Sequence, residues 1–202
     1  MRRLISRRRA AAVSLGLSAL FLLVYAGCQW ITAQRTEVRV FYFAWERSLP
    51  FVPPLIIPYL SIDLFFIAAP FLFHDPDALR TYARRVVAVI VIAGAVFLLL
   101  PLHYAFPRPP IGGWQGALFN GFRALDAPTN LFPSLHAALL WLLAGVYARE
   151  LRGPVRAIIL AWFVLIGLSP VLTSQHHVID IVGGLVLAAA TCYFIPAKPP
   201  NQ

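Results

Sequence analysis

Six apolar runs divide this chain, and they constrain its fold more than any other feature of the sequence. Several of them approach the roughly 20 residues that a helix needs to cross a bilayer. Composition agrees, because the 202 residues are 60% hydrophobic and only 12% charged, far below the charge of an ordinary soluble domain. We therefore expect an all-α, polytopic membrane protein: a six-transmembrane-helix bundle that forms a single integral-membrane domain over residues 1–202. The runs lie at about residues 10–30, 51–73, 86–104, 131–148, 157–173 and 178–195.

The cations indicate which helix ends share a side of the membrane. In a six-span arrangement, the positive-inside rule places the more basic side, and with it both termini, in the cytoplasm. The net charge of +9 does not favour nucleic-acid binding, because the arginines form short clusters between apolar runs instead of a basic helix face. The more basic side carries Arg2, Arg3, Arg7, Arg8, Arg9, Arg80, Arg84, Arg85, Arg149, Arg152, Arg156 and Lys198, and the other side carries Arg35, Arg39, Arg47, Arg108 and Arg123.

The first run has a second interpretation. A basic start followed by an apolar stretch and Cys28 is also typical of a secretory signal with a lipoprotein-type cleavage site. Tyr25 is a poor residue three places before such a cysteine, so we expect an uncleaved first span.

Two outer segments differ from the spans. Residues 34–50 mix charges with aromatic side chains, which suits an interfacial or amphipathic segment at the outer surface. Residues 105–130 are rich in Pro and Gly and form the only long outer loop between predicted spans. Long loops on a rigid scaffold often carry function.

Two short polar islands, residues 132–137 and 174–180, interrupt the apolar sequence. They hold three of the five histidines, His136, His176 and His177, together with Asp180. Ionisable groups beside membrane-spanning sequence are costly and therefore mark candidate functional sites. Two crossings separate His136 from His176, so we expect both islands on the same, extracytoplasmic, face.

Local spacing suggests how each island is built. Pro133 suits the first turn of a helix, whose free N–H groups, with Ser134, would form an anion site. His176 and Asp180 are four residues apart and would share one helix face. A carboxylate there can hold one imidazole N–H and leave the other nitrogen as a nucleophile.

This set of residues indicates phosphoryl transfer by histidine, which needs no metal and no cofactor. One histidine would attack phosphorus, a second would protonate the leaving oxygen, and N–H groups with cations would neutralise the phosphoryl oxygens. A zinc site is the alternative, because three histidines and an aspartate would suffice as ligands. No HExxH spacing supports it.

At these residues the chain resembles the type 2 phosphatidic acid phosphatase superfamily of membrane lipid phosphatases, whose motifs are KxxxxxxRP, PSxH and SRxxxxxHxxxD. The second motif is intact at residues 133–136. The third aligns Ser169, His176 and Asp180 at the required spacing, and the first retains only Arg108-Pro109. The resemblance covers the C-terminal half, and the six-span layout agrees with it.

The resemblance implies a role for each matching residue. His176 would be the nucleophile that becomes a phosphohistidine, Asp180 would orient it, and His136 would be the general acid. Ser134 and Arg108 would bind phosphate oxygens. His177 lies off the motif spacing, and we interpret it as an interfacial polar neighbour.

Two departures from the family pattern bear on the substrate. Pro101 stands where the first motif has lysine, and Pro170 where the third has arginine. Arg123 could replace one of these phosphate-binding cations, or it could be a solvated loop charge or a partner of Asp126. The sequence of residues 130–138 is also similar to the inositol phosphorylceramide synthase branch. The phosphodiester substrates of that branch carry less charge than a phosphomonoester.

We therefore expect a lipid phosphatase that hydrolyses a lipid phosphate or diphosphate at the extracytoplasmic face. The alternatives are a lipid headgroup phosphotransferase and a non-enzymatic membrane transporter. The expected partners are a phosphorylated lipid and the bilayer, with no nucleic acid. The expected location is a bacterial inner (plasma) membrane with the site facing outward. Neither the identity of the lipid nor the oligomeric state follows from the sequence.

Overall fold

The computed structural model describes residues 5–125 and 129–197, and in these residues the fold is all helical. The described residues form two isolated β-bridges, Arg39 to Leu102 and Leu102 to Asn130, and no β-strand. The predicted all-α class is therefore confirmed. The helices are α1 (Arg7–Thr32), α2 (Ile56–Ala68), α3 (Pro76–Leu99), α4 (Gly113–Leu125), α5 (Leu135–Glu150), α6 (Gly153–Leu172) and α7 (Val178–Phe194), with short 3-10 helices η1 (Ala44–Ser48), η2 (Pro53–Leu55) and η3 (Ala69–Leu72).

Within the described residues, four helical stretches are long and apolar enough to cross a membrane. They are Arg7–Thr32, Pro53–Leu72, Pro76–Leu99 and Gly153–Leu172, while α7 is a shorter apolar helix. These stretches indicate a membrane protein. Six helices correspond to the six predicted runs, although six crossings and cytoplasmic termini remain predictions.

Helix α3 starts about ten residues before the run predicted at 86–104. The Asp75 side chain accepts hydrogen bonds from the N–H groups of Asp77 and Ala78, and Pro76 occupies the first helical position. Such a cap starts a helix irrespective of hydrophobicity. Charged residues therefore extend the helix beyond the apolar stretch that the sequence shows.

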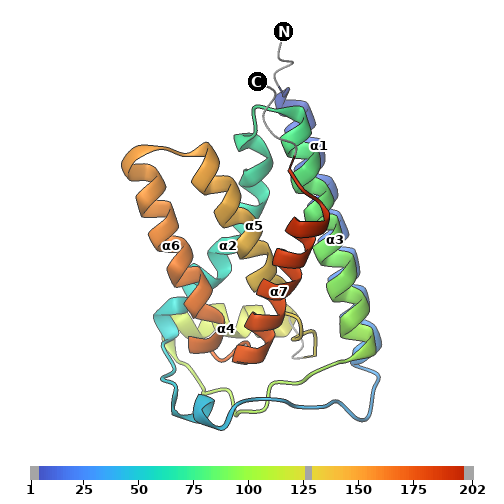
Figure 1. The fold of residues 1–202 in the computed structure, drawn as a ribbon. Coiled ribbons are helices and arrows are strands. Elements are labelled where there is room, and N and C mark those ends of the chain that lie inside the picture. The colour runs from blue at the N-terminus through green and yellow to red at the C-terminus, as the bar shows by residue number, and fades with distance from the viewer. Residues whose placement is uncertain (1–4, 126–128, 198–202) are drawn as a thin grey trace.

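The long helices run up and down between two ends of the bundle (Figure 1). The start of α1, the end of α7 and the α2–α3 and α5–α6 connections lie at one end. The opposite end carries the start of α5, the end of α6 and the start of α7, with α4 lying across it. We call this the site end. Both polar islands lie there, as span counting predicts.

The start of α5 is tied to α7. The N–H of Ser134 donates to the backbone oxygen of Asp180 at 2.9 Å. A side chain at Gly184 would overlap the backbone oxygen of Ser134, and one at Gly183 would overlap the ring of Phe132. The two glycines thus permit the close approach that brings the islands together.

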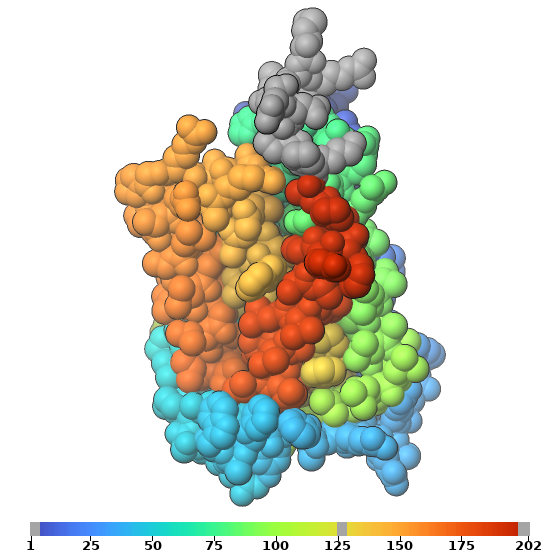
Figure 2. Space-filling model, viewed as in Figure 1, coloured from blue at the N-terminus to red at the C-terminus, as the bar shows by residue number. Residues whose placement is uncertain are grey.

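An outer layer covers the site end. The segment that contains η1 lies beneath the starts and ends of the helices, and its atoms form the lower face of the molecule (Figure 2). We call residues 34–52 the outer segment. It packs on the site end and buries one charged side chain, Glu46; its place at a membrane interface stays a prediction.

Candidate active site

His176 lies in the turn before α7, with its ring between Asp180 and Ser134. Its Nδ1 is 3.4 Å from Asp180 Oδ2, and its Nε2 is 3.4 Å from Ser134 Oγ. The prediction that His176 and Asp180 share a helix face is wrong in detail, because α7 begins at Val178. The two side chains still meet, since the turn folds back over the helix start.

The contacts of His176 define its tautomer. An ionised Asp180 carboxylate can only accept, so Nδ1 carries the proton and Nε2 keeps its lone pair. His176 is 8% exposed and Asp180 is 1% exposed. Both distances exceed those of a strong hydrogen bond, as is common before a substrate tightens a site. The second carboxylate oxygen, Asp180 Oδ1, is buried with no hydrogen-bond partner in the described residues.

Ser134 is the N-cap of α5, so Pro133 precedes the helix instead of occupying its first turn as predicted. The Ser134 Oγ accepts from the Ala137 N–H at 3.2 Å. The hydroxyl proton remains available to the His176 ring. The first turns of α5 and α7 therefore both direct their positive dipole ends toward the site end, although in α7 the Val178 N–H is already bonded to Glu46.

His136 is held away from this arrangement. Its Nε2 is 3.2 Å from the backbone oxygen of Ile166 in α6. Because a carbonyl can only accept, Nε2 carries a proton and donates it there. The ring also stacks on Tyr59, with centroids 4.7 Å apart. His136 and His176 are close enough to interact electrostatically, but the described residues show no hydrogen bond between them.

Pro170 explains why the Ile166 oxygen is available. In a helix that oxygen would accept from the N–H four residues later, but Pro170 has none. The Ile166 carbonyl oxygen instead accepts hydrogen bonds from the His136 ring and from the Ser169 hydroxyl. Pro170 also accepts the backbone N–H of His176 at 3.0 Å. The residue that replaces the family arginine thus holds both histidines.

Arg108 and Arg123 lie near each other with unsatisfied donors. In each guanidinium, Nε and one terminal nitrogen are buried without a hydrogen-bond partner in the described residues. Burial lowers the pKa of Arg123, and the nearby charge of Arg108 lowers it further. Two adjacent cations with unpaired N–H groups form a site for an anion. The burial argues against Arg123 as a solvated loop charge. Asp126 lies outside the described residues.

His177 is not the interfacial neighbour that the sequence suggested. It is 1% exposed, and its ring packs between Tyr42 and Tyr104. Its Nε2 accepts from the Ala105 N–H at 3.0 Å, so its Nδ1 proton donates to Glu46 at 2.8 Å. Sequence reasoning missed Glu46, whose only signal is a carboxylate within an aromatic segment.

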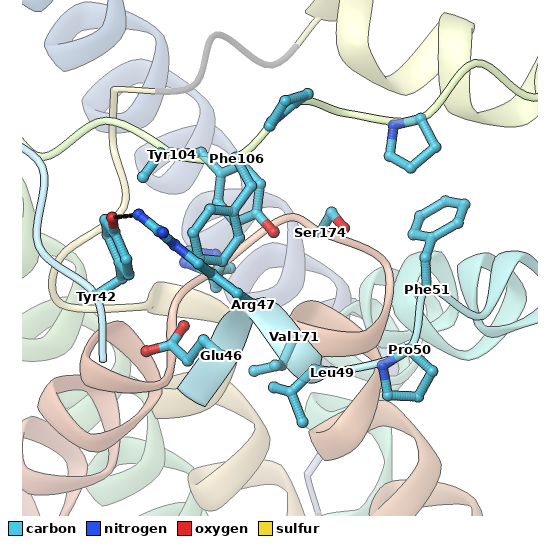
Figure 3. Close-up of a pocket in the computed structure, with 14 residues that line it drawn as sticks. Tyr42, Glu46, Arg47, Leu49, Pro50, Phe51, Tyr104, Phe106, Val171 and Ser174 are labelled. Atoms are coloured by element: carbon cyan, nitrogen blue, oxygen red, sulfur yellow. Dashed lines mark hydrogen bonds between the residues drawn. The ribbon is translucent and has the colours of Figure 1, made fainter. Parts of the chain in front are cut away.

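A cavity of about 450 Å³ opens beside His176. Figure 3 shows its wall, in which side chains of the outer segment face Tyr104 and Phe106 across the space. Burial raises the pKa of the Tyr104 hydroxyl, which hydrogen-bonds with Ser174. The cavity is lined by neither His136 nor Arg108. It is large enough for part of a substrate or for a second reactant.

In the described residues, no group of three or more His, Cys, Asp or Glu side chains is placed to hold a metal ion. All four side chains considered as zinc ligands have hydrogen bonds of their own: His136, His176, His177 and Asp180.

Comparison with known proteins identifies the family. A family model described as the PAP2 superfamily matches residues 82–202, more than half of the chain. The comparison with curated proteins gave no match, and the comparison with solved structures gave none. The matched region includes both islands and the Arg108–Arg123 pair, as the motifs predict. The chain belongs to the PAP2 superfamily.

Proposed function

We propose that this protein is an integral-membrane lipid phosphatase that works through a phosphohistidine on His176. The observation that carries the proposal is the unprotonated imidazole nitrogen His176 Nε2, which contacts only the Ser134 hydroxyl in the described residues and lies where two helix N-termini meet. The unpaired N–H groups of Arg108 and Arg123 supply positive charge for a phosphoryl group. Membership of the superfamily supports phosphatase or phosphotransferase chemistry in general.

In the first step, the His176 Nε2 lone pair attacks phosphorus and the bond from phosphorus to the lipid oxygen breaks. The Nδ1 proton stays on the ring, and Asp180 balances the positive charge of the phosphorylated imidazole. The arginines and the hydroxyl of Ser134 stabilise the charge on the phosphoryl oxygens. In the second step, water attacks phosphorus, phosphate leaves and the imidazole is regenerated.

His136 protonates the leaving lipid alcohol in this proposal. In the structure its Nε2 proton is directed at the Ile166 oxygen. Proton transfer therefore requires either a ring rotation or a second proton on Nδ1, which has no hydrogen bond in the described residues. After the first step, the deprotonated ring can accept a proton from the attacking water.

We also propose six membrane crossings, with the site end facing the extracytoplasmic side and both termini in the cytoplasm. The count of cations supports this orientation, because nine of the described arginines lie in segments at the end of the bundle opposite the site and five lie in segments at the site end. A bacterial inner membrane would then present the site to the periplasm.

The test gives purified protein a lipid phosphate monoester, with and without diacylglycerol as an acceptor. We expect phosphate release without acceptor, and a decrease on the order of 10²-fold in Arg108→Ala. Arg39→Ala is the matched control, because Arg39 is an exposed arginine at the same end, and it should keep wild-type activity.

Headgroup transfer is the second candidate, and the family positions at Pro101 and Pro170 favour it. Two missing cations suit a phosphodiester, which carries less charge than a monoester. Transfer to diacylglycerol from a phospholipid donor, with no phosphate released, would place headgroup transfer ahead of hydrolysis. If no phosphorylated lipid reacts and His176→Ala changes only lipid binding or flux, the protein is a transporter.

A further inference from the structure

We infer that Glu46 is a positioning residue for the catalytic groups, supplied by the outer segment. The inference rests on the function proposed above and deepens it. Glu46 lies outside residues 82–202, the part of the chain that the family model matches. Its role therefore does not follow from the family motifs.

Glu46 is a buried carboxylate whose oxygens all have donors. Its side chain is 2% exposed. Its Oε1 accepts from the Phe43 N–H at 2.9 Å, and Oε2 accepts from His177 Nδ1 at 2.8 Å and from the Val178 N–H at 3.3 Å. A charge is retained in such surroundings only where it is paired and hydrogen-bonded. Glu46 therefore joins the outer segment to the first turn of α7.

One branch of this network leads to the nucleophile. The backbone N–H of His177 donates to Asp180 Oδ2 at 2.8 Å. The same oxygen faces His176 Nδ1. The place of His177 thus sets the orientation of the carboxylate that directs the attacking nitrogen, and Glu46 holds His177.

The other branch leads to the phosphate-binding arginine. Because Glu46 keeps the His177 proton on Nδ1, Nε2 is free to accept from the Ala105 N–H. Ala105 stands three residues before Arg108, whose guanidinium lies over the ring of Tyr104. Glu46 therefore also fixes the loop that carries Arg108.

A residue that only stabilises the fold would make the same contacts. The experiment must therefore separate an effect on stability from an effect on the position of the catalytic groups. The variants are Glu46→Ala, which removes every acceptor, and Glu46→Gln, which keeps one carbonyl oxygen for His177. Glu37→Ala is the control, because Glu37 is an exposed carboxylate of the same segment. The measurements are phosphate release from a lipid phosphate monoester, the rate of phosphohistidine formation and the melting temperature in detergent.

We expect Glu46→Ala to lower kcat and the rate of phosphohistidine formation on the order of 10- to 100-fold, since a small displacement of reacting groups has effects of this size. KM should change by less than about threefold. Glu46→Gln should recover most of the loss while remaining below wild type, and Glu37→Ala should equal wild type.

Two results overturn the inference. One is a lower melting temperature for Glu46→Ala with an unchanged kcat, which would make the residue a structural pin alone. The other is wild-type kcat in Glu46→Gln if Glu46→Ala does not fold. If the wild-type protein itself forms no phosphohistidine and releases no phosphate, the proposed function fails first.

Discussion

His136 and His176 are the same residue type in two matching motifs, yet the fold holds them in opposite ways. His176 has its proton-bearing nitrogen toward Asp180 and its lone pair toward the anion site. His136 has its proton directed into α6, at the Ile166 oxygen. In the proposed mechanism, the nucleophile His176 is thus oriented before substrate binds, whereas the acid His136 must first leave the Ile166 oxygen. Motif identity alone does not distinguish these two states.

The largest effect should come from His136→Asn on substrates with poor leaving groups. We expect kcat on an alkyl phosphate to fall about 10²- to 10⁴-fold, because the departing alkoxide then has no proton donor. On p-nitrophenyl phosphate, whose leaving group needs no proton, formation of the phosphoenzyme should change little. Stopped-flow measurement of p-nitrophenol release checks this. An equal loss on both substrates would mean that His136 is not the acid.

Asp180→Asn should act on the other histidine. The amide oxygen at the Oδ2 position can still accept from the His177 N–H and from His176 Nδ1, but the variant loses the negative charge that balances the phosphorylated imidazole. We expect phosphohistidine formation to fall at least about 10²-fold with both leaving groups, by analogy with other buried carboxylate–imidazole pairs. Asp77→Asn is a control, because Asp77 belongs to an exposed ion pair with Arg80. Wild-type rates in Asp180→Asn would contradict the assignment of its role.

Gly184→Ala tests the close approach of α5 and α7. Its new methyl group would overlap the backbone oxygen of Ser134, which cannot move alone, whereas the one in Gly183→Ala would meet the ring of Phe132, which can turn. We expect Gly184→Ala to lower the free energy of unfolding by about 1–3 kcal/mol, with a smaller loss for Gly183→Ala. Thermal unfolding in detergent checks the order, and the reverse order would contradict the close approach of α5 and α7.

Pro170→Ala should have the smallest effect. It tests most specifically whether the Ile166 oxygen restrains His136. Alanine restores the N–H that satisfies the Ile166 oxygen, so that oxygen holds His136 less strongly. A contribution of about 0.5–1 kcal/mol corresponds to roughly a two- to fivefold rise in kcat on alkyl phosphates. The rise should vanish in the Pro170→Ala, His136→Asn double variant. A rise that persists there would show that Pro170 acts by another route.

Much of the fold could be predicted, because apolar runs and arginine clusters report helices and their ends directly. Helix starts could not be predicted from the apolar runs alone. Asp75 and Pro76 start α3 through capping, which hydrophobicity does not register. Ser134 acts as a cap where Pro133 was expected to begin the helix.

The candidate site was predicted in its residues but not in its hydrogen bonds. Motif spacing identified His176 and Asp180, because the spacing reflects a contact within one short segment. Glu46 could not be found this way, since its contact with His177 spans 131 residues of sequence. The hydrogen bond from His136 to the Ile166 oxygen could not be predicted either, because that oxygen is available only since Pro170 has no N–H to bond it.

The most direct test of the account is to identify which histidine becomes phosphorylated. Protein is mixed with p-nitrophenyl phosphate, quenched in alkali to preserve phosphohistidine, and mapped by mass spectrometry. We predict phosphate on His176 in the wild type, more of it in His136→Asn because water attack is slowed, and none in His176→Ala. Phosphate on His136, or turnover with no phosphorylated histidine in any variant, would contradict the account.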